Sequence, residues 1–527
     1  MKKLVLVHEP AFSNLVAFTR NFLGHVNPYL GRSLAHEPAM IGISFVNEGA
    51  ISGSPAALCE DYPPWRDAWE AWLAEKKAAE SATYGSVSAE PPSSMTPFFC
   101  RFVQEREQAF AARIKAVVRG ELGCQAPLTS LNGTSYPLAY MEVRASAYDY
   151  ADDHFYVDHP SFLETNWQLP SSLQNTNPLK DSNCGVQACS ARRLFDRPYT
   201  VTEFNFSGPG RYRGVGGMAT GALGAVQDWS GIWRFAWSHG EGGITSPQNK
   251  TMGFFDVSGD PLSLSAERAA ICLYLRRDLP VLEKAYIARV PPDTVAGPVS
   301  GNTEGMSFPC RWAGWHAQLG YVVSNAVPEG AIDAGAYPYV RSVTSATVRN
   351  TLGLGDELPA GVGGALDVDP DTGAFRIDTP RTSGGFAERG SVDAGTLAFE
   401  LEGAAATVWA SSLDGLPLRT SRHILLTHLT DVQNTNITYA DDTLTTVLSW
   451  GKLPHLMRSG AAHVRLRVAS GTFTVHALAS DGERLRAVPA TFAAGALSFT
   501  ADVAATAEAT WLYEIVRQPS PSVMILR

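Results

Sequence analysis

Two glutamates, Glu48 and Glu203, lie at or near the end of short runs of apolar, β-branched or aromatic residues. The runs are residues 43–48 (ISFVNE) and 199–205 (YTVTEFN), and both are typical of buried strands. In a barrel of parallel strands, catalytic side chains lie at the carboxyl ends of the strands. Two carboxylates about 5 Å apart, one as acid/base and one as nucleophile, are what retaining hydrolysis of a glycosidic bond needs. Either glutamate alone could simply end a strand, so the prediction depends on the pair and its neighbours.

The elements that must position these glutamates alternate between strands and helices along the first half of the chain. Short apolar runs predict strands over residues 39–48, 127–132, 153–157, 199–203 and 231–237. Helices are predicted over residues 11–24, 65–79, 97–120, 214–227 and 265–277. The first is amphipathic, the second is polar and the fourth is rich in small residues. This alternation indicates βα units around a parallel sheet, interrupted by a long loop rich in Ser, Asn and Pro over residues 161–196.

The pattern changes after about residue 291, where we expect helical periodicity to disappear. Turn signals such as Asp-Gly then separate short alternating segments, for example at residues 374–378, 463–468 and 473–478. Such a pattern is typical of an antiparallel β-sandwich. Because 527 residues are too many for a single core, we expect separate domains. We predict an α/β catalytic domain over residues 1–290 and an all-β region of one or two sandwich modules over residues 291–527.

The composition is that of an ordinary globular protein, with 45% apolar and 18% charged residues. The net charge of −10 and pI near 5.7 argue against a nucleic-acid partner, whereas a neutral carbohydrate substrate fits. No apolar run is long enough to predict a membrane span. The chain opens with basic residues like a signal peptide, but its apolar core stops at residues 8–10, so no complete signal peptide is expected. The oligomeric state is not readable from the sequence.

The seven cysteines are an odd number, and only Cys184 and Cys189 are spaced to suggest a small loop disulfide. Free thiols throughout are at least as good an interpretation. No cysteine pair has the spacing of a zinc site. Asp152 and Asp153 beside His154 resemble a metal cluster only superficially, because adjacent residues on a strand point to opposite faces. We expect no metal ion and no other cofactor.

Residues 25–32 (HVNPYLGR), continuing to Asn47 and Glu48, resemble the region between the third helix and the fourth strand of clan A glycoside hydrolases. They are especially similar to the mannanase- and cellulase-like enzymes of glycoside hydrolase family 5. In that clan the fourth strand ends in Asn-Glu, so the resemblance implies that Glu48 is the acid/base and that Asn47 binds the sugar 2-hydroxyl. Glu203 matches the clan's nucleophile at the end of the seventh strand.

The resemblance covers about residues 10–280 and extends to two further positions. His154-Phe155-Tyr156 fits the family's His-x-Tyr on the sixth strand, which implies that Tyr156 hydrogen-bonds the nucleophile or the ring oxygen and that His154 helps to orient it. Trp237 fits the tryptophan of the eighth strand that forms the sugar platform, whereas Trp229 and Trp233 are expected in the core. Asn132, at the end of the presumed fifth strand, faces either the sugar or the core.

One departure from the family concerns the early strands. Counted back from Asn47 and Glu48, the sequence begins in or just after the third strand, of which residues 2–7 could be a remnant. A (β/α)8-type barrel that is incomplete at its N-terminus would have two open strand edges. Either the sequence is a fragment or strands are supplied from elsewhere. Family resemblance suggests secretion or a periplasmic location.

Two functions are compatible with these features. The first is a retaining β-glycoside hydrolase that cleaves a β-linked poly- or oligosaccharide by double displacement, with Glu48 protonated in the resting enzyme and Glu203 as nucleophile. The second is a truncated, non-catalytic carbohydrate-binding relative. Further cleft positions are weaker candidates: Asp158 to Pro160 line the cleft or form a turn, and His25, Asn27, Tyr29, His239 and Glu241 are at most peripheral contacts.

Overall fold

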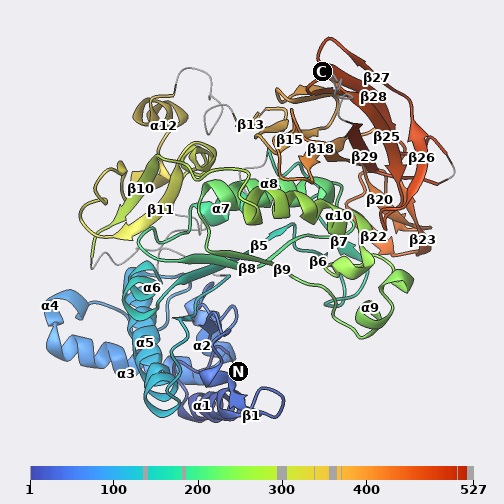
Figure 1. The fold of residues 1–527 in the computed structure, drawn as a ribbon. Coiled ribbons are helices and arrows are strands. Elements are labelled where there is room, and N and C mark those ends of the chain that lie inside the picture. The colour runs from blue at the N-terminus through green and yellow to red at the C-terminus, as the bar shows by residue number, and fades with distance from the viewer. Residues whose placement is uncertain are drawn as a thin grey trace.

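The computed structural model describes residues 2–133, 140–180, 185–292, 306–337, 339–354, 365–369, 371–506 and 508–518. In the first half, short parallel strands lie beside a layer of helices (Figure 1). Strand β3 (Ile43–Ser44) pairs with β4 (Leu128–Thr129), and β5 (Ala151–Val157), β8 (Tyr199–Phe206) and β9 (Gly231–Arg234) form a second parallel sheet in that order. The regular strands are shorter than predicted at residues 39–48, 127–132 and 231–237.

Five helices of the first half match the predicted segments, and five shorter ones in the described residues were not predicted. They are α1 (Glu9–Gly24), α2 (Pro55–Asp61), α3 (Pro63–Ala79), α4 (Ser81–Tyr84), α5 (Pro97–Lys115), α6 (Met141–Ala147), α7 (Gly185–Ser190), α8 (Arg213–Val226), α9 (Gly242–Thr245) and α10 (Pro261–Ala270). Helices α5 and α10 continue as π-helical turns at Ala116–Glu121 and Ile271–Leu275. No helix in the described part of the chain is long and apolar enough to cross a membrane.

Helix α8 is buried along its whole length, which its small residues permit. A Cβ added at Gly221 would lie 2.5 Å from the Cα of Ala270, so the backbones of α8 and α10 touch. At the start of α8, the buried Arg213 guanidinium pairs with Asp260 at 2.6 Å and with Asp431 at 3.2 Å. Burial of a cation requires such partners, and Asp431 belongs to the C-terminal half. Helix α8 is therefore fixed to both halves of the chain.

A third parallel sheet follows, in which β10 (Ala285–Val290) lies between β11 (Gln318–Val323) and β12 (Ile332–Ala336). Two helices accompany it, α11 (Phe308–Trp312) and α12 (Ser345–Leu352). The prediction that helical structure ends near residue 291 is therefore wrong. Helix α12 buries only Val348 and Leu352, because two turns offer too few positions for a clear periodic signal.

The C-terminal region contains two antiparallel sheets (Figure 1, orange to red). The order of the eight-stranded sheet is β13 (Leu366–Val368), β14 (Phe375–Asp378), β15 (Thr382–Ala387), β18 (Ala406–Ser412), β19 (His423–Leu429), β29 (Leu512–Gln518), β25 (Thr472–Leu478), β26 (Arg484–Val488). That of the five-stranded sheet is β16 (Gly390–Asp393), β17 (Leu397–Glu402), β24 (Ala461–Arg467), β28 (Ala496–Asp502), β27 (Ala490–Ala493). Their facing side chains, such as Leu426 and Leu466, share one apolar core.

One small sheet joins the two halves. Strands β6 (Ser161–Phe162) and β7 (Ser171–Ser172), from the long loop, form a hairpin, and β7 pairs with β22 (Thr446–Ser449), which in turn pairs with β21 (Thr438–Tyr439). Two further short strands, β20 (Val432–Thr435) and β23 (Lys452–Met457), flank β21 and β22 in the sequence and pair with each other. The loop that follows the β5 strand is thus held by the C-terminal region.

Candidate active site

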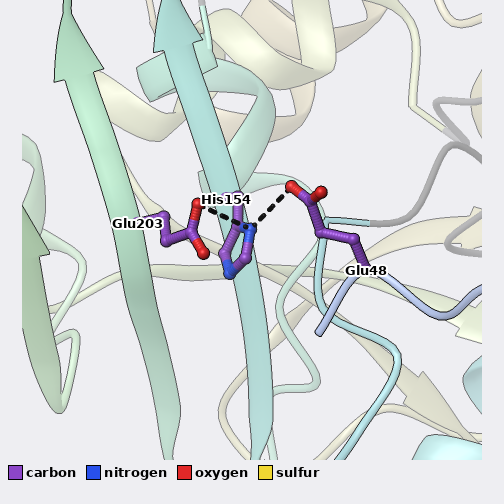
Figure 2. Close-up of side chains that lie close together, drawn as sticks. All are labelled: Glu48, His154 and Glu203. Atoms are coloured by element: carbon purple, nitrogen blue, oxygen red, sulfur yellow. Dashed lines mark hydrogen bonds and ion pairs between the residues drawn. The ribbon is translucent and has the colours of Figure 1, made fainter. Parts of the chain in front are cut away.

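Glu48, His154 and Glu203 converge from three different elements (Figure 2). Glu48 lies on the turn after β3, His154 on β5 and Glu203 on the neighbouring β8. His154 Nδ1 is 3.1 Å from Glu48 Oε1 and 3.6 Å from Glu203 Oε2. The three ligand atoms lie within 4.8 Å of one another. The two carboxylates, 155 positions apart in the sequence, therefore face one imidazole.

Asn132 holds Glu48 in place from the turn after β4. Its Oδ1 accepts a hydrogen bond from the Glu48 backbone N–H at 2.7 Å, and its Nδ2 lies 3.1 Å from Asn47 Oδ1 and 3.1 Å from His154 Nε2. Asn132 is buried, and Glu48 adopts a left-handed backbone conformation with φ of 50°. The structure therefore brings together Asn47, Asn132, His154 and both glutamates, and the side chain of Asn132 stabilises a turn that a non-glycine residue rarely adopts.

Gly133 makes room for this arrangement. Its φ is 58°, and a Cβ added there would lie 2.9 Å from Glu48 Cγ and 3.1 Å from His154 Nδ1. Glycine is the residue that tolerates both the left-handed backbone and the close approach of two side chains. Residues 134–139, which follow, lie outside the described part of the chain.

A buried carboxylate, Asp152, lies beneath the histidine. Its Oδ1 accepts from Thr200 Oγ1 at 2.7 Å and its Oδ2 from Thr202 Oγ1 at 2.5 Å, and Oδ2 is 4.0 Å from His154 Nε2. Burial raises the pKa of Asp152, and the hydrogen bonds from Thr202 and Thr200 partly offset this. Sequence reasoning missed this contact. Asp153 instead pairs with buried Arg144 at 3.2 Å, as expected for a residue on the opposite face.

The charges around His154 shift two pKa values in opposite directions. Burial alone would lower the pKa of His154, but the hydrogen bond to Glu48 and the charges of Glu203 and Asp152 outweigh burial and raise it. The hydrogen bond from His154 is in turn the main cause that lowers the pKa of Glu48. Both shifts run against the expectation that Glu48 is protonated in the resting protein. A single proton on the His154–Glu48 pair is therefore held mainly by the imidazole.

Tyr156 orients the second carboxylate. Its hydroxyl donates to Glu203 Oε2 at 2.7 Å, as the sequence predicted for a nucleophile contact. Burial, followed by the hydrogen bond to Glu203, raises the pKa of Tyr156. The phenol is thus a fixed hydrogen-bond donor throughout the physiological pH range.

A cavity of about 1030 Å³ is lined by Glu203, but not by Glu48, and extends along the strands. At one end it is lined by Asn47 and Asn132, which follow β3 and β4, and by Thr202 and Glu203. Glu203 was predicted to end its strand, but β8 continues for three residues beyond it. At the other end it is lined by residues that precede strands, namely Pro127, Asp149, Pro198 and Ser230. The cavity therefore runs along the inner face of the parallel strands, and Glu203 lies at its carboxyl end.

Two tryptophans differ from expectation. Trp237 lies three residues beyond the end of β9 and 48% of it is exposed. No hydrogen bond or ring contact in the described residues links its side chain to either carboxylate. Trp233 was expected in the core, yet it is 41% exposed and lines the cavity. Trp229 is buried as predicted. The alternation Gly231, Trp233, Phe235 along the cavity wall is the signal that could have identified Trp233.

The peripheral candidates have simpler roles. Asn27 Oδ1 accepts from the backbone N–H groups of Tyr29 and Leu30, so residues 25–32 form a turn. His239 forms a hydrogen bond with Asp256. Cys189 is a buried free thiol, and burial raises its pKa to about 12. Cys184 lies outside the described residues, so the loop disulfide stays a prediction.

Glu48, His154 and Glu203 are also the residues that could hold a metal ion. They form the one group of three or more potential ligands within reach of each other in the described ranges. Two carboxylate oxygens and an imidazole nitrogen suit a divalent first-row metal. The hydrogen bonds and ion pair already described account for this cluster without one.

No model of a known protein family matches this chain. No curated protein sequence matches it either. A solved structure with detectable similarity is a rhamnosidase from Novosphingobium sp. PP1Y, with 9% sequence identity and a TM-score of 0.24. The match covers 80% of this chain, which spans only 40% of the rhamnosidase chain. By its name that neighbour is a glycosidase, but a likeness this distant carries no argument about the fold, mechanism or substrate of this chain.

Proposed function

We propose that the chain is a retaining β-glycoside hydrolase that cleaves a β-linked poly- or oligosaccharide by double displacement. The observation that carries the proposal is the convergence of Glu48 and Glu203 on His154, with all three ligand atoms within 4.8 Å. Retaining enzymes need two carboxyl groups about 5 Å apart, whereas inverting enzymes need several ångströms more to admit a water molecule. The separation here favours the retaining geometry.

Glu203 is the proposed nucleophile. Tyr156 donates to its Oε2 at 2.7 Å, which leaves Oε1 to attack the anomeric carbon. The bond from that carbon to the leaving oxygen breaks as the ester bond to Glu203 forms. Water then attacks the same carbon, displaces Glu203 and releases the sugar with retained configuration. The phenol of Tyr156 stabilises the carboxylate that departs in the second step.

The His154–Glu48 pair is the proposed acid and base. His154 has a raised pKa and Glu48 a lowered one, so the resting pair holds one proton mainly on the imidazole. As the glycosidic bond breaks, Nδ1 gives its proton to Glu48 Oε1, and Glu48 passes one to the leaving oxygen. The pair is then a neutral imidazole and a carboxylate. In the second step Glu48 takes the proton of the attacking water, which restores the pair.

The remaining site residues have proposed positioning roles. Asn47 binds the sugar 2-hydroxyl, where contacts strengthen in the oxocarbenium-like transition state. Asn132 acts through Glu48 and Asn47, because its buried amide is bonded to both. Trp237 stays a candidate sugar platform by family resemblance alone. The site is built from polar groups without excess positive charge, which suits a neutral sugar.

We further propose that the first half, over residues 1–290, is a clan A, family 5-like barrel. The two large antiparallel sheets, formed from β13 onward, are the proposed β-sandwich region, and the parallel sheet of β10, β11 and β12 lies between the two in the sequence. The support for the barrel is the order of the parallel strands and the cavity along their inner face. Strand β9 has β8 as its one partner, and β3 has β4, within the described residues. In a closed barrel both edges would be paired.

Labelling with activated 2-deoxy-2-fluoro glycosides tests the mechanism. The fluorine slows both steps, and a good leaving group lets the glycosyl-enzyme accumulate. Incubation with the β-glucoside, β-mannoside, β-galactoside and β-xyloside should give one mass adduct, mapped to Glu203 by peptide sequencing. Glu203→Gln should lose both the adduct and turnover of aryl β-glycosides, whereas Glu60→Gln, an exposed glutamate on α2, should keep both. An adduct on another residue, or wild-type turnover by Glu203→Gln, contradicts the assignment.

The alternative is a non-catalytic carbohydrate-binding relative. The lowered pKa of Glu48 favours it, because an ionised carboxylate alone cannot protonate a leaving group. Under this alternative, the chain binds β-glycans but forms no fluoro-sugar adduct, and Glu203→Gln binds them with unchanged affinity. Binding without adduct formation in all four sugar series would therefore favour the alternative over the hydrolase.

A further inference from the structure

A connected group of aromatic rings extends outward from the carboxylate site. We call Tyr156, His159, Phe162, Trp167 and Phe255 the aromatic platform. Tyr156 and Phe255 have ring centroids 5.1 Å apart, Phe255 and Trp167 6.0 Å, and Phe162 and Trp167 4.9 Å. His159 lies 5.3 Å from Tyr156 and 5.7 Å from Trp167. Since Tyr156 also donates to Glu203, the rings connect the catalytic carboxylate to Trp167 through direct contacts.

Trp167 is the exposed outer end of this platform. Trp167 is 60% exposed, although it packs edge-on against His159 and Phe255 and in a tilted arrangement against Phe162. It sits with a left-handed φ of 66° between the strands of the β6–β7 hairpin, in a turn where the Gln168 N–H bonds to the Thr165 carbonyl at 3.1 Å. A single exposed aromatic residue needs no explanation. Trp167 differs, because other rings and a defined turn hold it in place. It contacts His159 and Phe255, and both of these contact Tyr156, the hydrogen-bond partner of Glu203.

The C-terminal region fixes the hairpin that carries Trp167. Strand β7 pairs with β22 at Ser171–Val447 and Ser172–Thr446, and the Leu173 N–H bonds to the Thr445 carbonyl at 2.8 Å. Phe254, which contacts Phe162 at 5.4 Å, packs against Trp450 at 4.9 Å. The composite sheet is visible in Figure 1 where β6, β7 and β22 meet. The position of Trp167 therefore depends on residues about 280 positions later in the sequence.

We propose that Trp167 forms a distal sugar-binding subsite, which stacks on a pyranose ring of an extended β-linked glycan whose reacting sugar lies at Glu203. This inference rests on the proposed function for the location of the reacting sugar. A tryptophan offers a large rigid apolar face at little entropic cost, and the apolar face of a pyranose covers it while the sugar hydroxyls stay in water. The substrate class is consequently a chain of several sugars rather than a monosaccharide glycoside.

The subsite makes a distinct kinetic prediction for Trp167→Ala. Contact with a remote, non-reacting sugar contributes equally to the ground state and the transition state, so its loss raises KM and leaves kcat unchanged. We expect KM for an aryl β-glycoside of four sugars to rise about tenfold, the usual scale for removing a central aromatic contact. An aryl monoglycoside does not reach Trp167, so its kcat/KM should not change.

Affinity electrophoresis in native gels that contain β-glucan, glucomannan, galactomannan or xylan tests binding independently of turnover. The wild type should be retarded by at least one polysaccharide, and Trp167→Ala and Trp167→Arg should each weaken that retardation about tenfold. Trp167→Phe should keep most of it. The matched control is Phe18→Ala, because Phe18 is equally exposed, at 60%, but lies on α1 outside the platform.

The outcomes separate this inference from the proposed function. Retardation that falls in both loss variants, with no fluoro-sugar adduct in the wild type, supports the subsite and refutes the hydrolase. Adduct formation with unchanged retardation and unchanged KM in both loss variants refutes the subsite and keeps the hydrolase. A wild type that no polysaccharide retards, or equal losses in Phe18→Ala, also overturns the subsite.

Discussion

Replacement of His154 by Asn tests the proposal that the His154–Glu48 pair holds the catalytic proton. In the wild type this proton is lost as His154 titrates, with a pKa above its ordinary value of 6.5. In His154→Asn the only remaining holder is Glu48, whose ordinary pKa is 4.5. The substitution also removes the hydrogen bond that is the main cause lowering the Glu48 pKa, and burial continues to raise it. We therefore expect the pKa of Glu48 to be higher in the variant than in the wild type, and to lie in the glutamate range rather than the histidine range.

The expected magnitude follows from the difference between these two pKa values. The alkaline limb of the kcat/KM profile should move down by about two pH units, which lowers kcat/KM at pH 7 about 100-fold. As the pH falls through the ordinary glutamate range the variant should recover much of the lost activity, because Glu48 can then be protonated without the imidazole. A purely structural defect would instead lower activity at every pH without moving the limb.

The assay is the pH dependence of kcat/KM for an aryl β-glycoside, with His463→Asn as control. His463 forms an exposed pair with Glu402 at 3.3 Å, so its replacement removes a similar pair away from the site. NMR titration of the His154 ring gives a reading without turnover: its pKa should exceed 6.5 in the wild type and fall in Glu48→Gln. An alkaline limb that stays in place in His154→Asn, or a His154 ring that titrates below 6.5, refutes the reasoning.

Three further predictions concern the site backbone, the role of metals and acid stability. Gly133→Ala should lower kcat at least tenfold with an intact near-ultraviolet circular dichroism spectrum, because the added Cβ approaches Glu48 Cγ to 2.9 Å at a φ of 58°; wild-type kcat would show that the turn adapts. Treatment with EDTA should leave turnover unchanged, since no step uses a metal, and metal-dependent recovery of lost activity would contradict this. Burial lowers the pKa of His428 from 6.5 to about 4, so the unfolded chain binds a proton first and stability falls as pH drops below 6.5. Relative to His428→Leu, the wild type should lose roughly 2–3 kcal/mol of unfolding free energy between pH 7 and 4.5, measured by urea denaturation; equal losses in both proteins would contradict it.

The parts of the fold that could be predicted are those with long, one-sided apolar patterns. Strands β5 and β8 and helices α1, α3 and α5 are long enough for the pattern of buried residues to identify them. Strand β3 has only two regular residues, because the chain turns away at residues 45–48 to place Glu48 in a left-handed conformation. The sequence predicted that Glu48 follows a strand but not its backbone conformation, since the turn depends on the hydrogen bond that the Glu48 N–H donates to Asn132, in the turn after β4.

The candidate site could be predicted in its residue types and less well in its protonation. Glu48, Glu203, Asn47, His154, Tyr156 and Asn132 were all named from the sequence, and all of them are joined by hydrogen bonds or ion pairs in the structure. The expectation of a protonated Glu48 considered two carboxylates alone, which repel each other, and repulsion raises one pKa. The imidazole between them reverses this effect. Whether a strand histidine points between two carboxylates depends on the register of β5 against β8, which no local pattern encodes.

The two-residue strands β7 and β22 show most clearly why part of the site cannot be read along the sequence. Each is too short to carry a pattern, and their pairing depends on how the C-terminal sheets lie against α8. The Arg213–Asp431 ion pair fixes that relation, because a buried guanidinium without its carboxylate would be strongly destabilising. Through this chain of contacts the sandwich region positions the hairpin that bears Trp167, beside rings that touch the partner of Glu203. The C-terminal half therefore helps to fix the position of Trp167, and under the proposed subsite the length of glycan that is bound depends on both halves together.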